Sequence, residues 1–231
     1  MGQLRMGAVL LHSAAAAIMV HGYRSLRNVP FDAFIRTQKG GHGQFLTIIG
    51  LFMAVITMVS GLGSDLFPSL PIFRTVKRTV LMIALPVATV VTTVYWSLIF
   101  FAEELILRPM AQGKVPQPDE SVPSSAGPTQ LQRIPLSTDL ALHAAPALAL
   151  LLDFYLIERK YTRAQAIYGG ILLTAIAGVL YASWTEYLAQ FNGSFPYPFL
   201  TENPFDVRVI IYVVLSIFAL VTFWFMNALH S

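Results

Sequence analysis

The stretch VRVIIYVVLSIFALVTFWFMNAL at residues 207–229 decides the fold class, because Arg208 is its only charged residue. An apolar segment of this length is what an α-helix needs to cross the roughly 30 Å hydrocarbon core of a bilayer. Toward the N-terminus, further apolar stretches of similar character occupy residues 6–21, 44–64, 76–101, 138–157 and 164–187. The sequence therefore predicts an all-α, polytopic membrane protein with about six transmembrane helices in one bundle. We expect residues 1–231 to form a single transmembrane domain.

Composition identifies the solvent that surrounds most of the chain. Hydrophobic residues make up 55% of the sequence and charged residues only 12%, about half the charged share of a soluble globular domain. A soluble fold would need more polar side chains on its surface, whereas lipid accepts apolar side chains that face outward. The net charge of +3 is small and spread over several connections, which argues against nucleic acid as a partner. The absence of cysteine excludes a cysteine nucleophile and disulfide bonds.

Proline and polar residues mark irregular places in the predicted spans. Residues 6–21 form a short span that contains His12, but its run of alanines favours close helix packing. No clear cleavage site follows, so we interpret this segment as a retained span and not as a signal peptide. Pro86 and Pro146 each remove a backbone donor inside a span and predict a bend. The long, polar stretch at residues 108–137 indicates a loop.

The connection at residues 187–206 has a different character from that loop. It combines several aromatic side chains with Pro196 and Pro198, which predicts an ordered cap or re-entrant segment at the membrane interface. Lys and Arg are divided almost evenly between the two faces of the bundle, but two compact basic clusters adjoin span ends on the face with both termini. This favours cytoplasmic termini in a multi-pass protein of an endomembrane or the plasma membrane.

Two chemically useful side chains are expected at one membrane depth. The second and fourth spans start on the same face, which places Thr47 and His143 roughly 5 to 8 Å below it at 1.5 Å per residue. A hydroxyl whose proton is taken by an imidazole can attack an ester carbonyl, so these residues are the candidate nucleophile and base. The structural alternatives are a Thr47 hydroxyl that bonds back to its own helix and a His143 that bridges two helices.

The third and fifth spans end on the same face and carry amphipathic aromatic residues there. We take these as candidate substrate-binding residues: Tyr95, Trp96, Trp184 and Tyr187. Their alternative role is an interfacial aromatic belt. Asp153 and His12 should instead lie near the terminal face, where depth allows them to pair and where we expect Asp153 to support the bundle. The five histidines are scattered and no nucleotide-binding or metalloprotease motif is present, so we expect neither a metal nor another cofactor.

Several short pieces of the chain carry a resemblance to a known family. In order they are Phe45-Leu46-Thr47, Ala84-Leu85-Pro86-Val87, Tyr95-Trp96, Ile134-Pro135, His143, Asp153, Trp184 and Tyr197-Pro198-Phe199-Leu200. As an ordered set they resemble the six-span androgen-induced gene 1 and androgen-dependent TFPI-regulating protein family. The resemblance implies a membrane threonine hydrolase that cleaves fatty acid esters of hydroxy fatty acids, with Thr47 as nucleophile and His143 as base. The chain departs from that family in having Asp153 where the family has a glutamate, and in its longer loop at residues 108–137. These departures leave the natural substrate open.

Two other classes of function remain open at this point. The first is a non-enzymatic lipid-binding or regulatory membrane protein, in which Thr47 and His143 bond only to each other. The second is a transporter, in which His143, Asp153 and His12 form a polar file through the bundle. The lack of an internal repeat counts against the transporter. The partners expected from the sequence are a lipid ester substrate and membrane lipid.

Overall fold

The structure is a computed structural model that describes residues 2–29, 31–107, 109–110, 130–131 and 133–231. Most of the predicted polar loop at residues 108–137 therefore lies outside the described residues. The long helices are α1 (Gly2–Ser25), α3 (Leu46–Leu66), α4 (Pro71–Phe101), α5 (Leu136–His143) followed by α6 (Ala145–Leu156), α7 (Gly170–Asn192) and α9 (Phe205–Leu229). The short elements are η1 (Leu26–Asn28), α2 (Asp32–Thr37), η2 (Gly41–Gln44), η3 (Glu103–Leu105), the π-helical turn η4 (Gln165–Gly169) and α8 (Pro198–Thr201). Two short strands, β1 (Pro109–Met110) and β2 (Gln130–Leu131), pair antiparallel.

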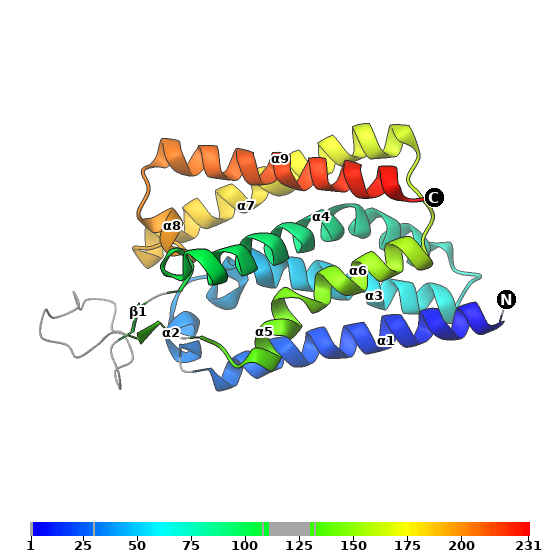
Figure 1. Cartoon of the computed structure of the whole chain (residues 1–231), viewed down its shortest axis with the longest axis horizontal. Coiled ribbons are helices and arrows are strands. Elements are labelled where there is room, and N and C mark those ends of the chain that lie inside the picture. Colours follow the sequence, from blue (N-terminus) through cyan, green and yellow to red (C-terminus); the bar gives the residue numbers. More distant parts are fainter. Residues whose placement is uncertain (1, 30, 108, 111–129, 132) are drawn as a thin grey trace, which may run out of the picture.

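Six helical segments are long and apolar enough to cross a membrane, and α5 and α6 together make one of them. Each overlaps one of the six ranges predicted from the sequence, so the protein is an all-α, multi-pass membrane protein. The helices run side by side along the long axis, and both chain termini lie at the same end of the bundle (Figure 1). The short elements α2 and α8 and the β1 strand gather at the opposite end, called the site end below.

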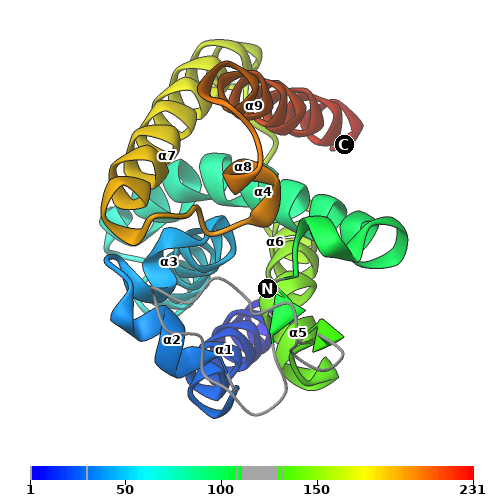
Figure 2. The same cartoon turned by 90° about the vertical axis from the view of Figure 1, so that its left-hand side faces the viewer.

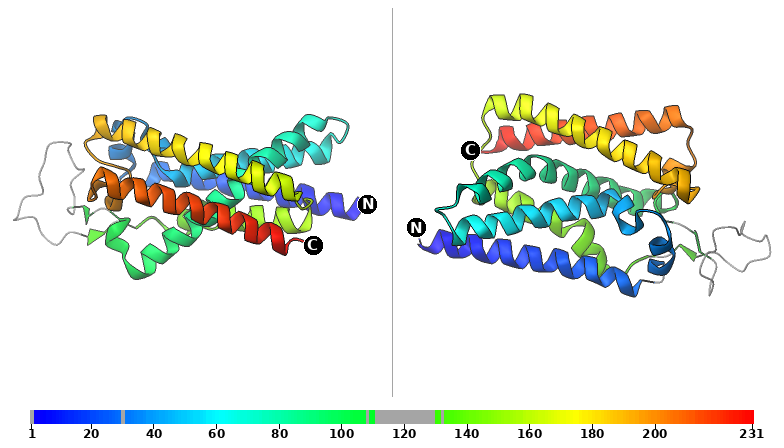
Figure 3. Two further views of the ribbon diagram at one scale, coloured as in Figure 1. Left: turned by 90° about the horizontal axis from the view of Figure 1, so that it is seen from above. Right: turned by 180° about the vertical axis from the view of Figure 1, so that it is seen from behind.

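The bundle has a packed part and a peripheral pair of helices. Helices α1, α3, α4 and α6 contribute the fully buried side chains Met19, Met58, Leu81, Leu85, Leu150 and Phe154. Helices α7 and α9 pack on each other and on α4 at one side (Figure 2; Figure 3). Only 11% of the most apolar window of α7 is buried against protein, compared with 56% for α5 and α6. The remaining apolar surface of α7 is suited to lipid, which is why it needs no protein partner.

The first span is longer than the predicted range of residues 6–21, since α1 continues to Ser25. Hydropathy falls after His21, but packing supports the added turn. Gly22 lies so close to α5 that a Cβ there would stand 2.7 Å from the Cβ of Ala141. Close contact with a neighbouring helix therefore extends α1 where hydropathy alone ends it.

The predicted bend at Pro146 is present as a break between α5 and α6. Ala144 separates the two helices with φ −115° and ψ −46°, and Pro146 follows in the first turn of α6, where its missing N–H is tolerated. The Thr92 hydroxyl of α4 donates a hydrogen bond to the carbonyl of His143 at the break. The break thus fixes the last residue of α5, which is the candidate base. Pro86, in contrast, does not interrupt α4.

Candidate active site

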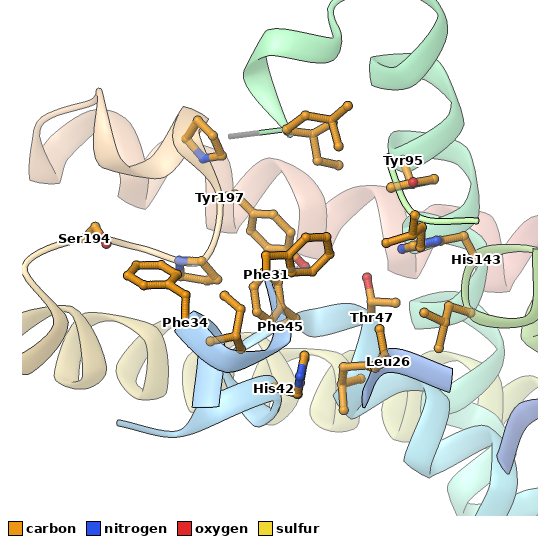
Figure 4. A pocket seen from close by; sticks show the side chains of 18 of the residues that line it. Leu26, Phe31, Phe34, His42, Phe45, Thr47, Tyr95, His143, Ser194 and Tyr197 are labelled. Carbon is orange, nitrogen blue, oxygen red and sulfur yellow. The ribbon is translucent and has the colours of Figure 1, made fainter. Parts of the chain in front are cut away.

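A cavity of about 410 Å³ opens at the site end and contains both residues of the predicted pair. Thr47 enters it from the first turn of α3, and His143 enters it from the end of α5 (Figure 4). Both side chains are largely buried, with 9% and 7% of their surface exposed. The hydroxyl and the imidazole that were predicted at one membrane depth therefore line one cavity, called the polar cavity below.

Thr47 differs in its local contacts from several other threonines of the spans. The hydroxyls of Thr57 and Thr89 donate back to carbonyls one turn earlier in their helices. Thr47 lies in the first turn of α3, and its hydroxyl and amide both interact with the Tyr197 hydroxyl. Helix α3 begins after Phe45, which offers no side-chain cap. The Thr47 hydroxyl therefore belongs to the cavity wall and not to the interior of a helix.

Tyr197 completes the first turn of α3 from a distant part of the sequence. Its hydroxyl accepts a hydrogen bond from the backbone N–H of Leu46 at 3.1 Å, which satisfies one of the free amides at a helix start. Burial raises the pKa of the Tyr197 hydroxyl above its ordinary value, and interactions with Thr47 and Leu46 offset part of that rise. The aromatic connection is thus an ordered cap over the site, as predicted. Tyr197 itself was not predicted as a site residue.

His143 is oriented by a carboxylate that the sequence analysis missed. Asp139 lies one helical turn earlier in α5, and its Oδ1 is 2.7 Å from Nδ1 of His143. A carboxylate accepts hydrogen bonds, so Nδ1 carries the proton and Nε2 is left as the acceptor. The signal was available, because residues four apart on a helix are neighbours. Thr47, His143 and Asp139 together supply a hydroxyl, a base and an orienting acid.

Tyr95 fixes the plane of the imidazole. Its ring stacks on His143 with centroids 3.5 Å apart and an interplanar angle of 2°, and Figure 4 shows it lying over the histidine. The Tyr95 hydroxyl also interacts with the side chain of Asp139. Tyr95 therefore contacts both members of the histidine–carboxylate pair, and it lines the cavity as proposed from the sequence.

The other predicted aromatic residues lie at different distances from the pair. Trp184 lines a second cavity, of about 550 Å³, and its indole N–H donates to the carbonyl of Gly43 at 3.0 Å. Trp96 stacks on Phe100, and the Tyr187 hydroxyl accepts from Lys39 Nζ at 2.8 Å. Trp96 and Tyr187 line neither of these two cavities.

Asp153 lies toward the terminal end of the bundle, apart from His143. Its Oδ1 is 2.9 Å from Nε2 of His12 and 2.7 Å from Nζ of Lys77. The other ring nitrogen of His12 is 2.7 Å from Oδ2 of Asp65. The predicted proximity of His12 and Asp153 is present, within a buried network of opposite charges. Within the part of the chain that the structure describes, no group of three or more His, Asp or Glu side chains is arranged to hold a metal ion.

The comparisons with known proteins identify the family of the chain. The profile of the FAR-17a/AIG1-like protein family matches residues 6–231. The chain belongs to this family. The match confirms the resemblance drawn from the sequence and extends over all six candidate spans.

Two relatives of this FAR-17a/AIG1-like protein are named as membrane proteins. The UPF0641 membrane protein PJ4664.05 of Schizosaccharomyces pombe is 27% identical over 226 residues, which cover 98% of this chain and 91% of that protein. The UPF0641 membrane protein YHR140W of Saccharomyces cerevisiae is 27% identical over 197 residues, which cover 77% of this chain and 72% of that protein. No solved structure matches the chain.

Proposed function

We propose that this FAR-17a/AIG1-like protein is a carboxylic ester hydrolase that cleaves fatty acid esters of hydroxy fatty acids within the membrane. The observation that carries the proposal is the 2.7 Å bond between Asp139 and Nδ1 of His143, which leaves Nε2 as an acceptor in the cavity that Thr47 lines. An acid, a base and a hydroxyl nucleophile are the components of the catalytic triads that recur on unrelated folds.

The first step forms an acyl-enzyme. Nε2 of His143 takes the proton of the Thr47 hydroxyl while Oγ1 attacks the ester carbonyl carbon. The bond between that carbon and the alcohol oxygen then breaks, and His143 gives its proton to the leaving oxygen. The products are an acylated Thr47 and a free hydroxy fatty acid. Asp139 holds the imidazole in the required tautomer and stabilises the cation that forms on it.

The second step restores the enzyme. A water molecule loses a proton to His143 and attacks the acyl carbon, after which the bond to Oγ1 breaks and Oγ1 recovers the proton. The fatty acid leaves. The position of the polar cavity at the site end supports this step, because Ser194 and Glu202 at its wall belong to the connection between α7 and α9. That connection lies outside the predicted spans, where water has access to the bundle.

The transporter alternative lacks support from the described residues. A polar file would join His143 to Asp153, but the two are ten residues apart, or roughly 15 Å along a helix. The buried side chains between them on α6 include Ala147, Ala149 and Leu150, all apolar. A lipid-binding protein without catalysis stays the main alternative, because the same cavities would hold an acyl chain.

The test of the proposed function is hydrolysis by the purified protein in detergent. Wild type should release a hydroxy fatty acid from its fatty acid ester, whereas Thr47→Ala and His143→Ala should be inactive at equal folded amounts. A fluorophosphonate probe should label wild type at Thr47 and fail to label Thr47→Ala. Activity that survives in both variants would exclude this pair as the catalytic residues. A folded wild type with no ester hydrolysis would favour lipid binding.

Asp139→Asn gives a sharper test of the role of the carboxylate. An amide at this position can present its N–H₂ to Nδ1, which reverses the tautomer of His143 and removes the acceptor at Nε2. We expect kcat to fall by about 10⁴-fold, as in the corresponding change in serine proteases, with melting temperature within a few degrees of wild type. The control is Asp206→Asn, at the exposed start of α9. Equal activity of Asp139→Asn and wild type would show that Asp139 is not part of the mechanism.

We also propose that both termini face the cytoplasm. The terminal end of the bundle carries two basic clusters, Arg74-Thr75-Val76-Lys77-Arg78 and Arg159-Lys160, next to span ends. Since the chain has no native cysteine, a single Ser231→Cys residue can be mapped without background. A membrane-impermeant maleimide should label it only after selective permeabilisation of the plasma membrane. Labelling in sealed cells, with the protein at the cell surface, would reverse the orientation.

A further inference from the structure

Two cavities of different composition meet at the candidate nucleophile. Among the residues that the structure describes, the polar cavity of about 410 Å³ and the second cavity of about 550 Å³ share only Thr47, Tyr95, Ile106 and Tyr197 in their linings. Both volumes lie within the roughly 300–1,000 Å³ range of small-molecule sites. An ester whose reacting carbon lies at Thr47 therefore has space for a chain on each side.

The second cavity is suited to a hydrocarbon chain. It lies between α3 and α4 on one side and α7 and α9 on the other, and none of the described residues that line it is charged. Two of its polar side chains are engaged elsewhere: Tyr212 contacts Glu186 at 3.2 Å, and the Ser216 hydroxyl donates to a backbone carbonyl at 2.8 Å. We call it the apolar cavity. The peripheral helices α7 and α9 form one wall, which gives it a border with lipid.

The polar cavity contains the ionisable groups of the site. His143, His42 and Glu202 line it, and none of them lines the apolar cavity. His42 is held by the carboxylate of Asp32, with Nε2 2.6 Å from Oδ1. Substrate atoms that exchange protons or carry a polar group are therefore accommodated on this side of Thr47.

The location of His143 sets the direction in which an ester binds. In the proposed mechanism His143 protonates the oxygen of the leaving alcohol, so that oxygen must lie on the side of Thr47 that faces the polar cavity. The acyl chain extends from the opposite side of the carbonyl carbon. It must then enter the apolar cavity.

We infer that the apolar cavity between α3, α4, α7 and α9 is the acyl-chain site, and that the hydroxy-acid arm occupies the polar cavity. This assignment rests on the proposed function and names the binding site of each half of the substrate. On acylation, the acyl carbon exchanges its bond to the alcohol oxygen for a bond to Oγ1 of Thr47. The acyl chain stays in the apolar cavity while the hydroxy acid, reprotonated by His143, leaves through the polar cavity.

Chain-length selectivity should follow from the shape of the apolar cavity. A substrate that arrives from the bilayer is already in an apolar solvent, so transfer of its chain into the protein gains little hydrophobic free energy. The end of the cavity instead limits the chain that fits. A bulky side chain introduced there should reject long acyl chains and leave short ones unaffected.

Ala177 is the position for the test variant, and Ala175, two residues earlier, is the position for the matched control. Ala177 lines the apolar cavity from α7, whereas Ala175 is exposed on the same helix and lines neither cavity. The substrates are two series of esters, one with acyl chains from butyryl to stearoyl on a fixed hydroxy acid, the other with a fixed acyl chain and hydroxy acids of increasing length. Ala177→Phe should lower kcat/KM for the longest acyl chain by roughly tenfold or more relative to the shortest. Ala175→Phe should match wild type in both series, and Ile134→Trp, in the polar cavity, should discriminate only in the hydroxy-acid series.

A tethered probe gives a second readout on the wild-type protein. An alkyl fluorophosphonate with a diazirine at the end of its chain should react with Thr47 and, on irradiation, crosslink to α4, α7 or α9. Crosslinks to α2 or to the connection between α7 and α9, or an Ala177→Phe effect on the hydroxy-acid series, would overturn the assignment and leave the hydrolase intact. Absence of both hydrolysis and Thr47 labelling would overturn the proposed function and the assignment with it.

Discussion

Tyr197 is the residue whose hydroxyl contacts the first turn of α3 from outside the spans. It accepts from the Leu46 amide at 3.1 Å and interacts with Thr47, and a phenol that accepts a hydrogen bond can still donate its own proton, here to an oxyanion formed beside Thr47. We predict that Tyr197→Phe lowers kcat by about 10²-fold, the effect of removing one oxyanion donor. Steady-state kinetics in detergent should show a small change in KM. A change in KM alone would assign Tyr197 to substrate binding.

The same hydroxyl gives a prediction for pH. Burial raises the pKa of Tyr197 above the ordinary value for tyrosine of about 10, so the group stays protonated and able to donate throughout the neutral range. Its contribution is therefore complete below pH 10 and is lost only as pH rises further. The ratio of wild-type to Tyr197→Phe activity should be constant between pH 7 and pH 9. A ratio that declines within that interval would contradict the role of the hydroxyl as donor.

Sequence reasoning found part of the site, for physical reasons that differ by residue. Thr47 and His143 could be predicted as a pair because the helical rise per residue converts sequence position into membrane depth. Asp139 could equally have been predicted from its spacing of four residues from His143, because such residues are neighbours on a helix. Membrane depth alone does not indicate this pairing. Tyr197 could not be paired with Leu46 or Thr47 in this way, since a nonhelical connection determines where its hydroxyl lies. The cavity shapes depend on side-chain packing among several helices, which no local pattern encodes.

At the scale of elements, the break between α5 and α6 positions the candidate base. Pro146 predicted a bend at this place. The sequence did not identify the hydrogen-bond partner of the His143 carbonyl, which is the Thr92 hydroxyl of α4. A partner from a neighbouring helix is what allows such a break within a membrane, because a free carbonyl there is costly.

Thr92→Val should show how much that hydrogen bond contributes to the stability of the protein. The substitution keeps the side-chain shape and leaves the His143 carbonyl without this donor, at a cost of about 1–3 kcal/mol. We expect a lower melting temperature and reduced ester hydrolysis, because His143 loses its backbone anchor. The control is Thr93→Val, since the exposed Thr93 hydroxyl bonds only within α4, to the Thr89 carbonyl. Equal melting temperatures for the two variants would show that the break holds without Thr92.

At the scale of the whole molecule, chemistry and structural support occupy opposite ends. The site end carries Thr47, His143 and the cap at residues 193–204, whereas the terminal end is held by the network around Asp153. That network joins α1, α3, α4 and α6 through His12, Asp65, Lys77 and Asp153. Gly61 of α3 permits it, because a Cβ there would stand 2.6 Å from Nε2 of His12.

Asp153→Asn tests whether Asp153 stabilises the fold without taking part in catalysis. The substitution leaves His12 and Lys77, which are 0% and 4% exposed, without the charge that faces both, and breaking a buried ion pair costs about 3–5 kcal/mol. Denaturation should therefore show a large loss of stability, while the fluorophosphonate still labels Thr47 in the fraction that stays folded. Arg36→Gln is the control, because its 3.7 Å pair with Asp32 is 65% exposed on the arginine side and such pairs contribute at most about 1 kcal/mol. A stable Asp153→Asn protein that no longer labels at Thr47 would instead place Asp153 in the catalytic machinery, and the separation of the two ends would be wrong.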